Sequence, residues 1–325
     1  MSEQQKDPMQ EITDRLEKGI SELFQSDQYK QYLTTMSKFH NYSLNNTILI
    51  LLQKPDASLI AGFRGWQEQF SRNVMKGEKS IKILAPCPIK KQIEMEVIDP
   101  DTQRPILDDK GSPVRKLMDI TIPRFKIVSV FDVSQTEGKP LPSLGTNELT
   151  GSVEHFPAFF KAIQSISPYP IFTEQIDHAT KGYCNYAERR IVIKEGMGEA
   201  QMLKTAIHEL SHAVLHGIYH DASTKLPPEL RKDRNTREVE AESVAFTVCQ
   251  YFGVDTSDYS FGYIAGWSSG RELKELKASL ELIRATSSDI ISRIEQTLQP
   301  VRQEELETIR TAPAQRAYIQ HKQRR

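Results

Sequence analysis

Apolar positions near the start of the chain recur at the spacing of helices, and further along they alternate as in strands. Two runs repeat every three or four residues and predict two amphipathic helices. They are Ile12, Leu16, Ile20, Leu23 and Phe24, and then Tyr29, Tyr32, Leu33 and Met36. A third helix is expected at 43–53, because Lys54-Pro55 ends its apolar run. Runs at 81–84, 93–98 and 122–133 predict strands, and the polar segment 99–116 predicts a solvated hairpin loop.

A stretch rich in Gly, Pro, Ser and Thr at 135–152 interrupts this pattern and predicts a domain boundary. Beyond it we expect helices at 153–166, 198–217, 236–252 and 270–298, and two short strands at 182–186 and 190–194. The expected fold class is therefore α+β. A mixed α/β domain at 1–140 precedes a mainly helical domain with a small sheet at 150–300, and a charged tail at 301–325 is expected to fray.

Composition narrows the class of protein without assigning a function. The chain has 325 residues, 26% of them charged, and a formal net charge of -1, which excludes a globally basic nucleic-acid binder but leaves local patches open. Its three cysteines are isolated, so we expect no disulfide framework and a reducing, cytoplasmic location. The longest apolar run, Thr47–Leu52, is too short to cross a bilayer, so no membrane partner is expected.

The helix expected at 198–217 contains the motif His-Glu-x-x-His. Residues four apart lie on one helical face, so His208 and His212 direct both imidazoles to one point with Glu209 beside them. Imidazole nitrogen is a good zinc ligand, and a catalytic zinc site has three protein ligands plus an open position for water. Apolar side chains at helical spacing around the motif indicate a buried face that holds the ligands rigidly. The sequence therefore predicts a Zn²⁺ site that takes its third ligand from elsewhere.

The helix expected at 236–252 offers three carboxylates for that role. Glu238 and Glu242 are one turn apart on a shared face, while Glu240 points elsewhere. We expect Glu238 to be the third ligand, and Glu242 to hydrogen-bond a ligand histidine and fix its tautomer. Two alternatives remain open: Glu242 is itself the ligand, or the acids form a solvated face without a ligand.

A His, His, Glu site predicts metal-dependent hydrolysis of a peptide. Glu209 would act as the general base on water and pass the proton to the leaving amine. His216, Tyr219 and His220 are candidates for a further oxyanion donor, or are structural or surface residues. The strand at 190–194 is a candidate edge for binding an extended peptide, or is an ordinary sheet strand.

These motifs resemble those of known families. With His208-Glu209-x-x-His212 and the Glu238-x-x-x-Glu242 helix, the second half resembles zincin-type metallopeptidases related to the ImmA/IrrE group. The first half is similar to the N-terminal domain of ArdC-type antirestriction proteins in the segments 41–46, 63–67, 74–80 and 130–135. The resemblance covers about 29–252 and departs in a hairpin inserted at 90–121. It implies an N-terminal domain that binds single-stranded DNA and a metalloprotease-like domain, often encoded on plasmids or other mobile elements.

The charges between residues 28 and 91 are consistent with a nucleic-acid partner. This segment contains ten Lys or Arg residues and only three acidic residues, with seven aromatic residues interleaved among them. Basic side chains follow a phosphate backbone and aromatic rings stack on bases, although several of these rings lie at helical spacing and fit a core equally well. The candidate DNA-binding residues are Arg64, Trp66, Arg72, Lys76, Lys79 and Lys82.

The leading hypothesis is a single-stranded-DNA-binding antirestriction protein of a plasmid or mobile element that carries a zinc peptidase site. A regulatory zinc peptidase that cleaves a specific repressor is the first alternative. A metal-containing binding module without catalysis is the second.

Overall fold

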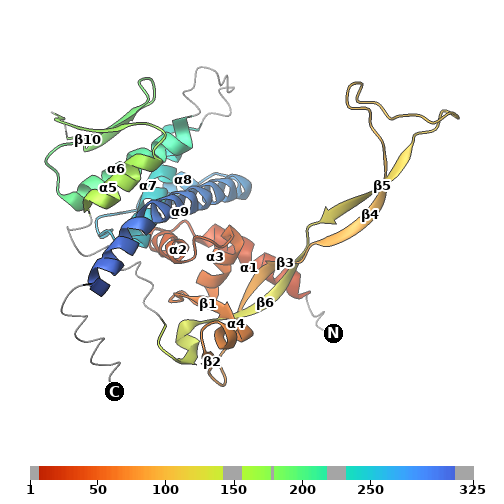
Figure 1. The fold of residues 1–325 in the computed structure, drawn as a ribbon, viewed down its shortest axis with the longest axis horizontal. Coiled ribbons are helices and arrows are strands. Elements are labelled where there is room, and N and C mark those ends of the chain that lie inside the picture. The colour runs from red at the N-terminus through yellow and green to blue at the C-terminus, as the bar shows by residue number, and fades with distance from the viewer. Residues whose placement is uncertain (1–6, 142–155, 177–178, 218–231, 312–325) are drawn as a thin grey trace.

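The computed structural model describes residues 7–141, 156–176, 179–217 and 232–311 of the chain. In these residues, helices and four small sheets form an α+β fold (Figure 1), which confirms the predicted class. The two predicted domains meet at 140–150, and most of that stretch lies outside the described residues. The division into domains therefore stays a prediction.

Three helices open the chain, as predicted. Helix α1 (Pro8–Glu22) begins where the Asp7 side chain accepts a hydrogen bond from the Met9 backbone, with proline in the first turn. Helix α2 (Ser26–Lys38) follows, and the Ser43 side chain caps α3 (Leu44–Gln53). Apolar spacing predicts all three helices, and side-chain caps support it at the starts of α1 and α3.

A small antiparallel sheet packs beside these helices, in the order β1 (Ile60–Gly62), β6 (Phe125–Asp132) and β3 (Ile81–Pro86). Asn46 joins α3 to β3, since its amide donates to the Leu84 carbonyl and its carbonyl oxygen accepts from the Leu84 N–H. The expected strand at 122–133 is shorter and begins at Phe125, while Ile122 ends a separate strand (Arg115–Ile122) that was not predicted. Pro123, between the two strands, has no N–H to donate to a ladder.

Short elements complete the first half, and the sequence pattern did not predict most of them. Helix α4 (Phe63–Glu68) follows β1, and β2 (Arg72–Val74) pairs with β7 (Thr136–Gly138) beyond the 3-10 turn η1 (Val133–Gln135). Three-residue strands contain too few positions for an alternating pattern to emerge.

The predicted hairpin is present and long. Strands β4 (Ile89–Glu96) and β5 (Arg115–Ile122) pair antiparallel along their whole length, and isolated bridges at Ile98–Pro105 and Leu107–Pro113 continue toward the tip. The hairpin projects away from the rest of the molecule (Figure 1).

The second half holds a three-stranded sheet and five helices among its described residues. The sheet order is β8 (Ile171–Glu174), β10 (Arg190–Lys194) and β9 (Gly182–Asn185), and β8 was not predicted. The helices are α5 (Phe156–Ile166), α6 (Glu199–His216), α7 (Arg234–Tyr251), α8 (Ile264–Ser268) and α9 (Leu273–Thr311). Helix α9 extends beyond Pro300, where we expected the tail to begin.

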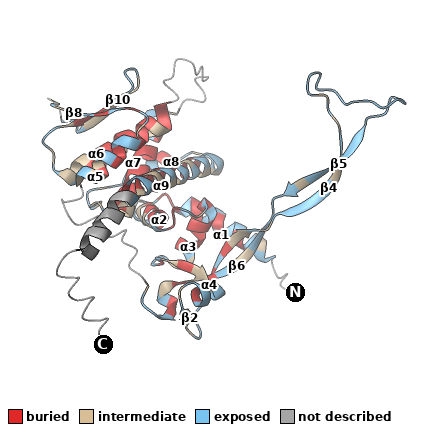
Figure 2. Ribbon diagram, viewed as in Figure 1, coloured by how far each residue is buried: buried red, intermediate tan, exposed pale blue. Residues whose placement is uncertain are grey.

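One apolar core joins the two halves of the chain. Buried side chains of α1, α2 and α3 belong to the same cluster as those of α5, α6, α7 and α9 (Figure 2). Within it, the Tyr29 hydroxyl on α2 lies 2.8 Å from the Ser243 hydroxyl on α7. The sheet β1-β6-β3 has a smaller cluster of its own around Ile60, Ile81 and Val130. None of the helices in the described residues has the length and hydrophobicity of a membrane-spanning segment.

Candidate metal centre

Helix α6 is anchored along its apolar face. Ala206, Ile207 and Leu210 are fully buried and pack in the main core. His208 and His212 lie one turn apart on the adjoining face, with 23% and 11% of their side chains exposed. A helix held this firmly fixes both imidazoles before any ligand arrives.

Helix α7 packs against α6 and presents its carboxylates to it. The helix begins where Asp233 accepts a hydrogen bond from the Thr236 N–H. Val239 and Val244 are buried, and this packing turns Glu238 and Glu242 toward the histidines.

The structure brings His208, His212 and Glu238 together. One donor atom from each lies within 4.8 Å of the others, and among the described residues this is the cluster with that geometry. The two Nε2 atoms are 3.1 Å apart, and Glu238 Oε2 lies 3.4 Å from His212 Nε2 and 3.7 Å from His208 Nε2. Ligands of a tetrahedral zinc at about 2.1 Å are about 3.4 Å from one another. The donor set therefore fits a metal ion of that size.

Glu242 lies where it can orient one of the histidines. Its Oε2 is 3.0 Å from His208 Nδ1. A carboxylate there accepts the Nδ1 proton and leaves the His208 Nε2 lone pair facing the donor cluster. Burial alone would lower the pKa of His208, but Glu242, Glu209 and Glu238 outweigh burial and raise the pKa.

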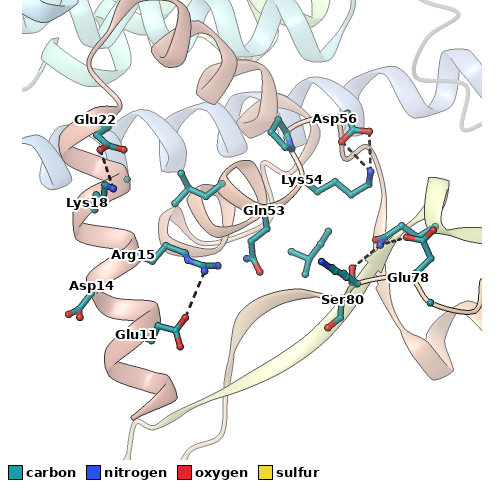
Figure 3. A pocket seen from close by; sticks show the side chains of 17 residues that line it. Glu11, Asp14, Arg15, Lys18, Glu22, Gln53, Lys54, Asp56, Glu78 and Ser80 are labelled. Carbon is teal, nitrogen blue, oxygen red and sulfur yellow. Dashed lines mark hydrogen bonds and ion pairs between the residues drawn. The ribbon is translucent and has the colours of Figure 1, made fainter. Parts of the chain in front are cut away.

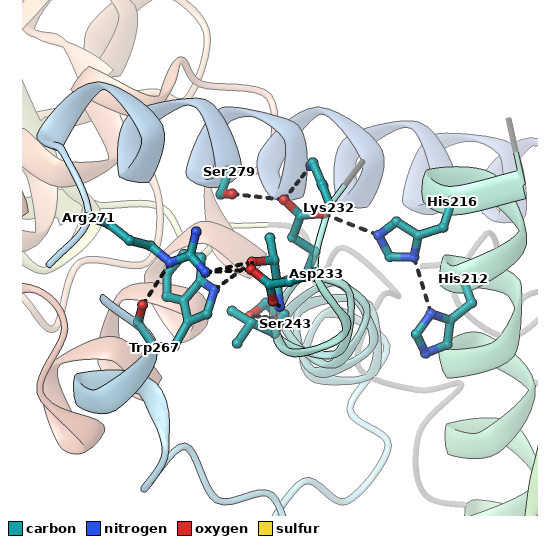
Figure 4. A network of polar contacts seen from close by, with 11 residues as sticks. His212, His216, Lys232, Asp233, Ser243, Trp267, Arg271 and Ser279 are labelled. Atoms are coloured by element: carbon teal, nitrogen blue, oxygen red, sulfur yellow. Dashed lines mark hydrogen bonds and ion pairs between the residues drawn. The ribbon is translucent and has the colours of Figure 1, made fainter. Parts of the chain in front are cut away.

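His212 is supported from the other side by a buried chain of polar groups (Figure 4). His212 Nδ1 lies 3.2 Å from His216 Nδ1, and His216 Nε2 lies 3.2 Å from Glu240 Oε2. Glu240 Oε1 accepts hydrogen bonds from Lys232 Nζ at 2.5 Å and from Ser279 Oγ at 2.8 Å. His216 and Glu240 are both fully buried.

This chain admits one consistent set of tautomers. Glu240 is ionised, because His216 and Lys232 outweigh the effect of its burial and lower its pKa. Burial lowers the pKa of His216, so the ring is neutral and donates its Nε2 proton to Glu240. His216 Nδ1 then accepts the Nδ1 proton of His212, whose Nε2 lone pair is left for a metal.

Glu240 and His216 were both considered from the sequence, but neither was assigned the role of supporting His212. Glu240 does point away from the face that Glu238 and Glu242 share, as expected, but it reaches the site through His216. The spacing His212-x-x-x-His216 was the available signal, since it places a third imidazole on the same face of α6.

Glu209 lies beside the cluster with the properties of a base. Burial raises its pKa above the ordinary glutamate value, and the imidazoles of His208 and His212 lower it in part. A hydrogen bond from the backbone of Cys184, on β9, also contributes to its ionisation and fixes its orientation.

An open cleft surrounds these residues. Two cavities of about 390 Å³ and about 410 Å³ share Gly182, His208 and Glu209 in their walls. Gly182 starts β9, and a Cβ atom there would lie 2.7 Å from Thr205 Cγ2 on α6 and 2.8 Å from the Val192 carbonyl oxygen. Only glycine allows β9 to approach the motif helix this closely.

The structure corrects the expected peptide-binding edge. Strand β10 (190–194) lies in the middle of its sheet, paired on both sides, so its backbone is not available to a peptide. In the described residues the edge strand beside the cleft is β9. Sequence alone did not reveal this, because β8 is only four residues long and supplies the second neighbour.

The structure also alters which residues are candidate oxyanion donors. His216 is fully buried with both ring nitrogens engaged, so it cannot reach a substrate. Tyr219 and His220 lie outside the described residues. Tyr186, Arg234 and Arg237 line the cleft beside Glu238 and bring polar hydrogens close to the cluster.

The candidate DNA-binding residues fall into two groups. Trp66 is fully buried and donates its indole N–H to the Phe131 carbonyl at 2.9 Å, so its ring cannot stack on a base. Arg72 is half-buried, with its guanidinium bonded to Thr136 and to the Lys139 carbonyl oxygen. The exposed candidates are Arg64, Lys76, Lys79 and Lys82. Of the aromatic residues considered for stacking on bases, Phe63, next to Arg64, is half exposed.

A cavity of about 1040 Å³ lies between α1, the end of α3 and the loop before β3 (Figure 3). Lys79 lines it, and the other three basic side chains among its described lining residues are paired with acids. The pairs are Arg15–Glu11, Lys18–Glu22 and Lys54–Asp56. With these acids in its walls, the cavity has no excess positive charge for a phosphate backbone.

Fold and site together define an α+β protein with a candidate metal centre between two packed helices. Comparison with known proteins finds a family model that matches the first part of the chain. The model described as the N-terminal domain of anti-restriction factor ArdC matches residues 2–131.

Similarity to individual proteins extends further along the chain. An uncharacterized Bacillus anthracis protein, pXO2-81, is 27% identical over 331 residues, covering 93% of this chain and 54% of that protein. The chain thus spans about half the length of the curated relative it matches. Two crystal structures of antirestriction protein ArdC from plasmid R388 cover 90% of this chain. The metal-free structure is 19% identical to this chain, with a TM-score of 0.47, and 98% of its chain is covered. The Mn(II)-bound structure is 17% identical, with a TM-score of 0.46, and 99% of its chain is covered.

Proposed function

We propose that the chain is an antirestriction-type protein in which a metal-dependent peptidase site accompanies single-stranded-DNA binding by the N-terminal part. The observation that supports the peptidase site most strongly is the meeting of His208, His212 and Glu238 beside Glu209 in an open cleft. Three donors of this kind leave a fourth position open, which is the arrangement of catalytic rather than structural zinc.

The chemistry follows from the groups in the cleft. Zn²⁺, or another divalent ion held by these three donors, would supply a Lewis acid and lower the pKa of bound water. Glu209 accepts the proton of the attacking water, helped by its raised pKa, and passes it to the nitrogen of the leaving amine. The exposed edge of β9 binds the substrate as an extended peptide.

The nucleic-acid part of the proposal is supported by the family match and by surface charge. Residues 2–131 match the ArdC N-terminal domain, and Arg64, Lys76, Lys79 and Lys82 are exposed within that range. Such side chains follow a phosphate backbone without reading its sequence, and Phe63 offers a ring for stacking. We place this function in the cytoplasm, on incoming plasmid or mobile-element DNA.

The peptidase proposal is tested with two variants in cells. His208→Ala removes a metal donor, whereas Glu209→Gln keeps the donors and removes the base. We expect both to abolish protection of incoming unmodified DNA from restriction, measured as transfer efficiency into a restricting host. If Glu209→Gln retains full protection while His208→Ala loses it, hydrolysis is not the function, and the site acts as a metal-containing binding module.

The DNA proposal is tested by charge reversal of Lys76, Lys79 and Lys82 together. We expect weaker binding of a single-stranded oligonucleotide and a salt-dependence slope smaller by about 2, since each lost phosphate contact removes about 0.7. The matched control reverses Lys110, Lys161 and Lys274, which are exposed elsewhere on the molecule. Equal effects of the two triple variants would contradict a binding surface at 76–82. DNA affinity independent of salt would leave the regulatory peptidase as the better account.

A further inference from the structure

The β4–β5 hairpin is an exposed arm whose surface is not explained by the metal centre. Among the described residues it is a separate two-stranded sheet, and it extends away from the body (Figures 1 and 2). An isolated two-stranded sheet is marginally stable in water and gains stability from additional strands or a covered apolar face.

One face of the arm is apolar. Directly opposed residues in an antiparallel pair share a face, and Ile89 pairs with Ile122, Ile93 with Met118, and Lys91 with Ile120. The face consists of Ile89, Ile93, Met95, Met118, Ile120 and Ile122, with Lys91 between Ile89 and Ile93 and Lys116 opposite Met95. Met95 and Met118 are 42% and 50% exposed. A surface of this kind marks an interaction site.

The outer edge of β4 has free backbone groups. At its two ends, the Cys87 N–H donates to Arg124 and the Val97 N–H donates to Val114, both across the hairpin. Along an antiparallel ladder, hydrogen-bonded and non-hydrogen-bonded pairs alternate. The odd-numbered residues between Cys87 and Val97 therefore also direct their backbone groups toward β5. The backbone groups of Lys90, Gln92, Glu94 and Glu96 are therefore directed outward, ready to pair with another strand.

The charges along that edge are complementary to a second copy of the same strand. Lys90 lies near one end of β4, and Glu94 and Glu96 lie near the other. In an antiparallel pair of copies centred on Ile93, Lys90 of each strand lies opposite Glu96 of the other, and Gln92 lies opposite Glu94. These are outward-directed positions, as a hydrogen-bonded pairing requires.

We propose that two copies of this chain associate through antiparallel pairing of β4 with β4, centred on Ile93. The result is a four-stranded sheet with two Lys90–Glu96 ion pairs across the new seam. The apolar faces of both arms continue across it, because opposed residues share a face. A nucleic acid is a poor occupant of the arm, since residues 87–124 contain seven basic and seven acidic side chains.

Charge-swap variants of the full chain test the pairing by sedimentation. We expect the wild type to dimerise, and either Lys90→Glu or Glu96→Lys to raise the dimer dissociation constant by roughly tenfold or more, since two opposite-charge pairs become like-charge pairs. The double variant Lys90→Glu/Glu96→Lys is expected to restore the dimer. An equimolar mixture of the two single variants is expected to form a heterodimer, because each then offers the charge that the other lacks.

The restoring variants and a control on β5 distinguish loss of the seam from damage to the arm. Glu96 also lies 3.6 Å from Arg115 within the hairpin, so Glu96→Lys alone could weaken the arm itself, whereas restoration of the dimer requires the seam. Asp119→Lys makes the same size of charge change on β5 and is expected to leave the dimer intact. A monomeric wild type, or dissociation by Asp119→Lys with none by Lys90→Glu, would overturn the proposal.

Discussion

At the scale of residues, carboxylates on one helix have distinct tasks because their partners differ. Glu238 is half exposed and faces both Nε2 atoms, Glu242 contacts His208 Nδ1, and Glu240 is buried behind His216. The neighbouring imidazoles of His212 and His208 lower the pKa of Glu238, which favours the charged form that a metal requires. The donor cluster therefore depends on side chains that do not belong to it.

Glu240→Gln tests that dependence with little change of shape. Lys232 and Ser279 hold the side-chain carbonyl oxygen, so the new amide group faces His216 and donates to its Nε2. His216 then carries its proton on Nδ1, and His212 is forced to carry its own on Nε2, the atom that faces the metal. We expect a 10- to 100-fold loss of zinc affinity, measured by competition with a chelator.

The control for this variant is Tyr29→Phe. It removes another buried hydrogen bond, between the Tyr29 and Ser243 hydroxyls, in which no donor of the cluster takes part. We expect it to lower the free energy of unfolding and leave zinc affinity unchanged. Unchanged zinc affinity in Glu240→Gln would show that the buried chain is purely structural.

At the scale of elements, the segment 130–135 joins several parts of the first half. Asp132 accepts hydrogen bonds from the N–H groups of Ser58, Leu59 and Ser134. Its own N–H donates to Gln135, whose amide reaches Glu78 and the Lys79 carbonyl oxygen. The side chains that suggested a family resemblance thus fix the ends of β1 and β6 and the loop that carries Lys79.

Asp132→Asn is expected to reduce stability in a pH-dependent way. Burial alone raises the pKa of Asp132, but the backbone hydrogen bonds outweigh it and lower the pKa below the ordinary value. Asp132 therefore stabilises the fold above its unfolded pKa of about 4, and the stabilisation is lost as pH falls through the lower folded value. We expect the variant to lose about 1–3 kcal/mol of unfolding free energy at neutral pH.

Denaturant unfolding of both proteins from neutral to acidic pH measures this effect. The difference between wild type and variant should shrink as pH falls below about 4. A difference that stays constant with pH would contradict the role assigned to the ionised carboxylate.

The elements also show where the sequence was sufficient and where it was not. The motif helix and the Glu238 helix follow from local apolar spacing, and the structure brings together the donors they were expected to carry. Trp66 and β10 were misinterpreted because burial and strand order depend on distant segments, Phe131 in one case and β8 in the other. The supporting role of Glu240 was overlooked for the same reason, since its partners lie on α6 and α9.

At the scale of the whole molecule, the first three helices share one apolar core with α6 and α7, the helices that carry the candidate metal centre. The helix α2, which carries fully buried Leu33, packs against α7, which carries Glu238. The same arrangement leaves the β4–β5 arm outside the core, with its apolar face exposed. A substitution that destabilises α2 should therefore also destabilise the candidate metal centre, whereas a substitution in the arm should not.

Leu33→Ala is expected to lower the free energy of unfolding by about 2–5 kcal/mol, because it leaves a cavity in the shared core. Bound zinc should be released at a correspondingly lower denaturant concentration, in the same transition. Leu107→Ala, at a residue 58% exposed on the arm, serves as the control and should change neither value. Zinc release unaffected by Leu33→Ala would mean that the two halves unfold independently.

The most direct test of the central claim is zinc-edge X-ray absorption on the full chain loaded with one equivalent of Zn²⁺. The structure predicts that the zinc ion is bound by two imidazoles and by oxygen ligands, one of which comes from Glu238, and by no sulfur ligand. It predicts that Glu242→Gln keeps both imidazoles with weaker binding and that Glu238→Ala replaces a carboxylate with water. Failure to retain zinc, or a shell with fewer than two imidazoles, would contradict the assignment of His208, His212 and Glu238 as a metal centre.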